Sequence, residues 1–95
     1  MKIILENNVI KRYYEKIKAS DAVLVINTIK KGIENYIGGN TFLEMGYAHA
    51  LDKKLYCLNP IPDMSYTSEM LAMRPTILNG DCSVTRFFIW MSTKD

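Results

Sequence analysis

The residues between positions 38 and 48 have types and a spacing that would suit a ligand-binding or catalytic site. Gly38 and Gly39 are adjacent, Asn40 follows as the expected N-cap of a helix, and Glu44 comes four residues later. Adjacent glycines at a helix start let backbone amides approach a ligand closely, and that end of a helix favours negative charge. A carboxylate in a partly apolar pocket can attack the anomeric carbon of a sugar. A glutamate that only complements its helix dipole gives the same pattern, so spacing alone leaves both interpretations open.

Helices and strands must alternate along the chain to position these residues. Residues 7–19 carry apolar side chains at helical spacing, and residues 22–26 are continuously apolar, which is typical of a strand buried in a parallel sheet. This alternation predicts one α/β domain over residues 1–95, with parallel strands joined by right-handed crossovers. The expected helices are 7–19, 41–51, 65–73 and a terminal helix capped by Ser83 that contains Phe87, Phe88 and Trp90, and the expected strands are 22–26, 55–58 and 76–78.

Ligands in sheets of this kind bind beyond the carboxyl ends of the strands. Asn27 follows the first strand directly, which makes it a ligand-facing candidate. Asp21 precedes the same strand, so its position favours the other end of the sheet, where it could equally well end or cap the first helix. The polar loops that the rule places at the ligand-binding edge are 27–40, 59–65 and 79–82.

Residues 20–25, 36–41, 44–48 and 54–56 together resemble the nucleoside 2-deoxyribosyltransferase superfamily. The superfamily pattern is an aspartate before an apolar strand, a glycine-containing turn, an E-x-G-x-A helix segment and a lysine that opens the next strand. The resemblance covers roughly residues 9–82 and implies a flavodoxin-like three-layer sandwich, a truncated Rossmann-like fold with a short parallel sheet. It also implies cleavage or transfer at the N-glycosidic bond of deoxynucleosides or their 5′-monophosphates.

The resemblance assigns roles to individual residues and no role to a metal or an organic cofactor. Glu44 matches the catalytic nucleophile, and Asp21 matches an aspartate that contacts the substrate or supports the site. Ser68 is similar to a serine that contacts the phosphate across a subunit interface in the nucleotide hydrolases, but the match is short and an ordinary serine at a helix start is the favoured interpretation. The residues that would shape the floor of the sugar or phosphate pocket are Gly38, Gly39 and Asn40.

Members of the superfamily begin with a strand–helix–strand unit that has no counterpart before Asn7. Without that unit, the strand at 22–26 would expose an apolar edge, which is a pairing hazard. The sequence therefore predicts a homo-oligomer that pairs this edge or covers it with residues 1–19 of a partner. The alternatives to an enzyme are a catalytically inactive nucleotide-binding module and an oligomeric structural module, because a half-open pocket excludes water poorly.

Composition narrows the partners and the compartment. The net charge of +2, from 12 basic and 10 acidic residues, is too small to indicate nucleic acid or an anionic membrane as a partner. No apolar run approaches a membrane span, and no secretory leader is evident, so a cytoplasmic location is expected. Cys57 and Cys82 fit neither a disulfide framework nor a metal site. The partner that the resemblance implies is a small nucleoside or nucleotide.

Overall fold

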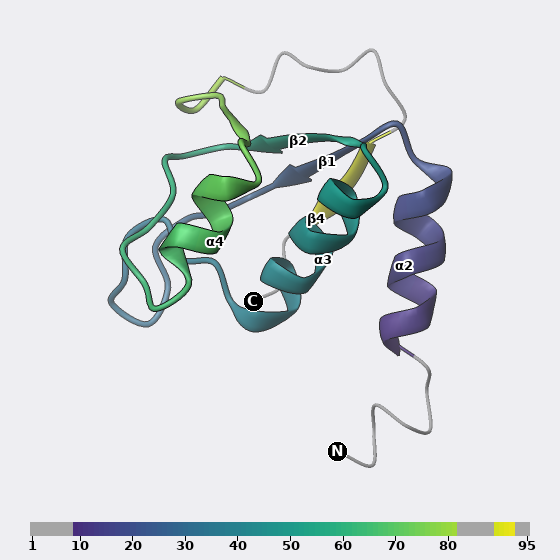
Figure 1. Ribbon diagram of the computed structural model, residues 1–95. Coiled ribbons are helices and arrows are strands. Elements are labelled where there is room, and N and C mark those ends of the chain that lie inside the picture. The colour runs from purple at the N-terminus through teal and green to yellow at the C-terminus, as the bar shows by residue number, and fades with distance from the viewer. Residues whose placement is uncertain (1–8, 82–88, 93–95) are drawn as a thin grey trace.

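The computed structural model describes residues 9–81 and 89–92 of the chain (Figure 1). Four parallel strands form one sheet in the order β3-β2-β1-β4, which confirms the α/β class and the parallel strands. In the described part of the chain, no helix is long and apolar enough to span a membrane. The elements are α2 (Val9–Ala19), β1 (Ala22–Val25), α3 (Gly39–Ala50), β2 (Lys54–Cys57), α4 (Thr67–Ala72), β3 (Thr76–Ile77) and β4 (Ile89–Ser92).

The three helices that the structure describes lie on one face of the sheet (Figure 1). Val23 and Val25 of β1 stand in register with Leu55 and Cys57 of β2, and these alternate residues face the helices. Ala22 and Leu24 are buried but lie outside that cluster, as expected for side chains on the other face. The described residues therefore form two layers, and the flavodoxin-like three-layer order stays a prediction. The helix residues that complete the core are Ile17 from α2, Met45 and Ala48 from α3, and Met70 from α4.

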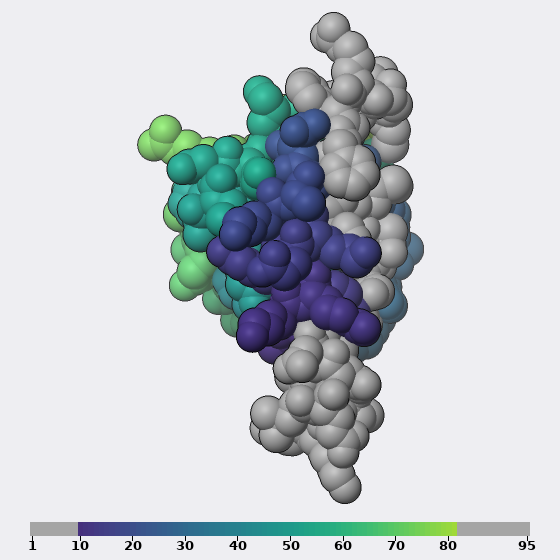
Figure 2. Space-filling view, turned by 90° about the vertical axis from the view of Figure 1, so that its right-hand side faces the viewer, coloured from purple at the N-terminus to yellow at the C-terminus, as the bar shows by residue number. Residues whose placement is uncertain are grey.

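Helix α2 lies at the outer side of the helical layer, where it packs against α3 and contributes Ile17 to the core. The rings of Tyr14 and Tyr47 meet edge to face, with their centroids 5.2 Å apart. Figure 2 looks onto α2 and shows it at the molecular surface. The polar side of this helix is strongly basic, and its exposed cations are Lys11, Arg12, Lys16 and Lys18.

Strand β4 contradicts two predictions: the terminal helix that would contain Trp90 and the exposed edge of the strand at 22–26. Trp90 belongs to β4 and not to a terminal helix, whereas Ser83, Phe87 and Phe88 lie outside the described residues. The periodicity of a short apolar run does not separate helix from strand. Strand β4 pairs with β1 over all four residues, and β2 pairs with its other side, so β1 exposes no edge. Strand β1 therefore offers no free edge for self-association, and a homo-oligomer stays a prediction without this support.

Helix α3 begins earlier than expected. Its N-cap is Gly38, with φ −82° and ψ 179°, so Asn40 lies inside the first turn instead of capping the helix. No side chain caps this end, and the backbone N–H of Phe42 donates to the carbonyl oxygen of Gly38 at 2.9 Å. The two-residue shift moves Glu44 into the second turn of the helix, deeper than the sequence suggests.

Candidate functional site

The loops after β1 and β2 are joined at the carboxyl edge of the sheet by two asparagines. The side chain of Asn27 is fully buried, and its Nδ2 donates to the carbonyl oxygens of Asn59 at 2.8 Å and Pro60 at 3.1 Å. Its Oδ1 accepts from the backbone N–H of Asn59 at 2.9 Å, and Asn59 Nδ2 returns a bond to the Asn27 carbonyl oxygen at 2.8 Å. Asn27 therefore positions the two loops, and its predicted contact with a ligand would require part of this network to open.

The start of α3 presents open backbone at the same edge. Gly38 is buried, whereas Gly39 and Asn40 are exposed. A Cβ atom added at Gly39 would meet no atom of the described residues within 4 Å. The fold described here therefore does not require glycine at position 39, and close approach of a ligand would be a sufficient reason for it.

Replacing Gly39 by alanine tests separately whether the fold or a ligand requires glycine at this position. Because alanine is the better helix former and the space is open, we expect Gly39→Ala to unfold at the same temperature or slightly higher. If a ligand approaches the backbone there, the same variant loses affinity or turnover about tenfold, equivalent to about 1.4 kcal/mol. Thermal unfolding and ligand titration check the two effects separately. Unchanged ligand affinity in a stable variant would remove residue 39 from the site.

Glu44 lies on the side of α3 that faces the sheet. Its side chain is 1% exposed, and its Oε2 atom is shielded from solvent. The buried residues of this helix follow the helical repeat, which places Glu44 on the same face as Thr41, Met45 and Ala48. A carboxylate is seldom fully buried because its transfer out of water is costly. Buried helix positions that face a sheet are usually apolar. A glutamate at such a position breaks this pattern, as residues of functional sites often do.

An aromatic pair stands next to the start of α3. Phe42 and Tyr66 stack with ring centroids 4.4 Å apart and an interplanar angle of 26°. The Tyr66 hydroxyl donates to the carbonyl oxygen of Ile37 at 2.5 Å. Burial raises the pKa of Tyr66, and the nearby Tyr36 hydroxyl adds to the effect, so Tyr66 stays a hydrogen-bond donor above neutral pH. Phe42 is not among the residues predicted for the site, although its position in the first turn of the helix that carries Glu44 is a usable signal.

The remaining two predicted residues are both exposed. Ser68 lies in the first turn of α4, which begins beside the carboxyl edge because Tyr66 contacts Ile37. Asp21 precedes β1 and so lies at the amino edge of the sheet, opposite Asn27. Strand β1 therefore does not bring Asp21 next to Glu44, the other predicted catalytic residue. The role of Asp21 stays a prediction.

Cys57 is buried inside β2, and burial raises the pKa of its thiol from 9.0 to about 12. This thiol is therefore inert and serves as a core residue. Because the folded state holds the proton more tightly, its contribution to stability is complete below pH 9.0 and is lost as the pH rises toward about 12. We expect the urea-derived free energy of unfolding to fall more steeply over this range in the parent chain than in Cys57→Ala. Equal slopes would contradict the assignment.

Comparisons of the chain with family models, with curated proteins and with solved structures gave no match. The candidate site therefore consists of a buried carboxylate on α3, an open glycine-containing helix start and a stacked aromatic pair at one edge of a parallel sheet.

Proposed function

We propose that this chain cleaves or transfers the N-glycosidic bond of deoxynucleosides or their 5′-monophosphates, with Glu44 as the nucleophile. The observation that carries the proposal is the fully buried carboxylate of Glu44, on the helix that begins at the exposed Gly39. The stacked Phe42–Tyr66 pair supports it, because it supplies an apolar wall next to that helix start. The sequence resemblance to the deoxyribosyltransferase superfamily supports it independently of the structure.

The chemistry follows from a carboxylate held away from water. A carboxylate oxygen of Glu44 attacks C1′, and the bond between C1′ and the base nitrogen breaks. Its electron pair leaves with the base, which takes up a proton from water. The resulting glycosyl ester is then opened by water, giving hydrolysis, or by the nitrogen of a second base, giving transfer. Either route restores the Glu44 carboxylate, and neither consumes an oxidant or a reductant.

The depth of Glu44 also favours a second function. With 1% of its side chain exposed, Glu44 meets a sugar only after the chain around α3 opens. A protein that does not open in this way would keep the surface at Gly39 and Asn40 for nucleotide binding without turnover. The second candidate function is therefore a nucleotide-binding module without catalysis.

Chromatographic detection of free base separates the two functions. The purified chain is incubated with a panel of deoxynucleosides and their 5′-monophosphates, and its thermal unfolding is followed with the same compounds. Base release that grows with protein concentration supports the enzyme. Protection against unfolding without base release favours the binding module. Neither base release nor protection, from a folded chain, would contradict both.

A further inference from the structure

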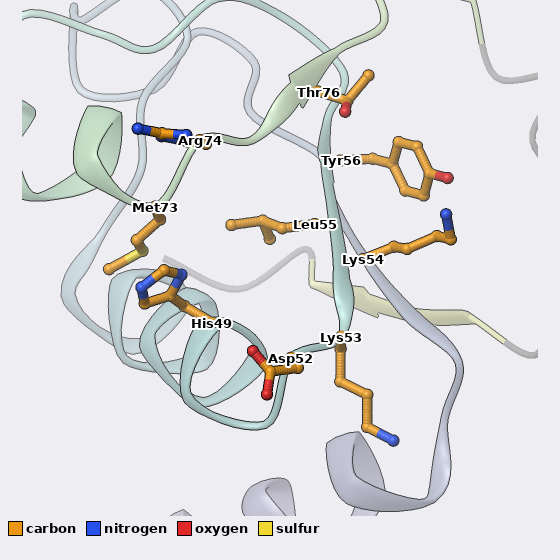
Figure 3. A pocket seen from close by; sticks show the side chains of 9 residues that line it. All are labelled: His49, Asp52, Lys53, Lys54, Leu55, Tyr56, Met73, Arg74 and Thr76. Atoms are coloured by element: carbon orange, nitrogen blue, oxygen red, sulfur yellow. The ribbon is translucent and has the colours of Figure 1, made fainter.

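A second cavity lies at the other edge of the sheet. It has a volume of about 300 Å³ and is bounded by the last turn of α3, the first residues of β2 and the segment that joins α4 to β3 (Figure 3). This places it at the amino ends of β2 and β3, away from the carboxyl edge where Asn27 and Gly39 lie. The cavity is thus distinct from the site proposed for glycosidic chemistry, and it is within the size range of small-molecule pockets.

The side chains around this cavity combine an apolar centre with charged ends. Figure 3 shows Leu55 extending from β2 toward Met73, while Arg74 and Asp52 lie at opposite ends. His49 lies between those ends, on the side formed by α3. A ligand in this space would therefore meet an apolar surface along its length and a guanidinium at one end.

The charges of the chain favour an anion at this edge. The last turn of α2 and the segments that lead into β1, β2 and β3, residues 16–21, 49–54 and 73–75, hold five lysines and arginines against two acids. The loops at the carboxyl edge, 26–38, 58–66 and 78–81, hold two lysines against three acids. A surface of one predominant sign raises the local concentration of the opposite charge, so anions are drawn to the amino edge.

Two strained backbone positions coincide at the cavity. Asp52, with φ 57°, follows α3, and Arg74, with φ 53°, follows α4. Glycine is the least strained residue at such helix ends, and an acid at a helix C-terminus is additionally unfavourable. Both residues nevertheless line the same cavity. The positive φ of Asp52 and Arg74 lowers stability, and a function of these two residues in the cavity would account for their presence.

We propose that this cavity binds a small organic anion, a phosphate monoester or a carboxylate, with its charged group at Arg74 and its apolar part against Leu55 and Met73. Arginine presents a planar set of donors that matches both anions. His49 can donate a further hydrogen bond to the same ligand. The proposal rests on the cavity and its charges, and not on the glycosidic activity.

The test is a titration followed by backbone amide NMR shifts, with phenyl phosphate, benzoate and the neutral benzyl alcohol as probes. We expect saturable shifts of residues 49–56 and 73–76 with one or both anions and none with the alcohol, and the two anions show which charged group is preferred. Arg74→Gly should bind about tenfold more weakly, the expected loss of one charge-assisted hydrogen bond. Asp52→Gly should bind more tightly, because it removes the acid from the cavity.

Both glycine variants should unfold at a higher temperature than the parent chain, since glycine relieves the positive φ. Weaker binding by a more stable Arg74→Gly protein therefore cannot be attributed to misfolding. Lys31→Gln, in a loop at the carboxyl edge, is the matched charge control and should bind as the parent does. Unchanged binding by Arg74→Gly, equal binding of benzyl alcohol, or shifts confined to the start of α3 would each overturn the proposal.

Discussion

The Glu44→Gln variant is expected to stay folded and to release base at least about 10³-fold more slowly than the parent chain, by analogy with other nucleophile substitutions. The amide has nearly the same size and shape as the carboxylate, so the packing of α3 against the sheet is preserved. It carries no negative charge, however, and cannot form the glycosyl ester on which both hydrolysis and transfer depend. Steady-state kcat/KM for base release and the midpoint of thermal unfolding measure the two properties on the same preparation.

The matched control is Glu69→Gln, which makes the same chemical change at an exposed position in the first turn of α4. We expect this variant to retain the activity of the parent chain. If Glu44→Gln kept full activity, the carboxylate would have no part in the reaction. If Glu44→Gln lost activity only together with its fold, Glu44 would be assigned a structural role, and the binding module would become the better account.

The Asn27→Ala variant should lose about 3 kcal/mol of stability, a large share of the total for a domain of this size. The change removes the three hydrogen bonds that the Asn27 side chain makes to Asn59 and Pro60. It leaves two carbonyl groups and one N–H at the carboxyl edge to find new partners, each at a cost of about 1–3 kcal/mol where water does not reach them. Urea denaturation followed by circular dichroism measures the loss.

Asn40→Ala supplies the comparison, since Asn40 is exposed in the first turn of α3 and does not cap the helix through its side chain. We expect this change to alter stability by less than about 0.5 kcal/mol. Equal stabilities of the Asn27→Ala and Asn40→Ala proteins would show that the asparagine network does not hold the loops together.

The elements with a strong local signal were predictable from the sequence. The continuous apolar run at 22–26 predicted β1, because such a run is stable only when it is buried on both faces. All four residues of β1 are buried. Pro75 ended α4 at Ala72, since a residue before proline disfavours helix. The placement of Gly39, Asn40 and Asn27 at the carboxyl edge followed from the order of the elements.

The features that were missed depend on contacts distant in the sequence. Strand β4 is defined by its pairing with β1, more than 60 residues away, and no local pattern reports that pairing. The partner of Asn27 is a backbone segment that starts 32 residues later. The burial of Glu44 depends on where α3 starts and on the sheet beneath it. The sequence therefore predicted Glu44 as a site residue but not that its side chain is buried.

The central claim, that Glu44 attacks C1′, is tested most directly by trapping the glycosyl ester. A 2′-fluoro-2′-deoxyarabinosyl nucleoside slows both formation and breakdown of such an ester, because the fluorine destabilises the oxocarbenium-like transition state. The account predicts that the intact mass of the protein rises by one fluorosugar, that the added mass maps to the peptide containing Glu44, and that Glu44→Gln gains none. Base release by a chain that forms no adduct, or an adduct on another residue, would contradict it.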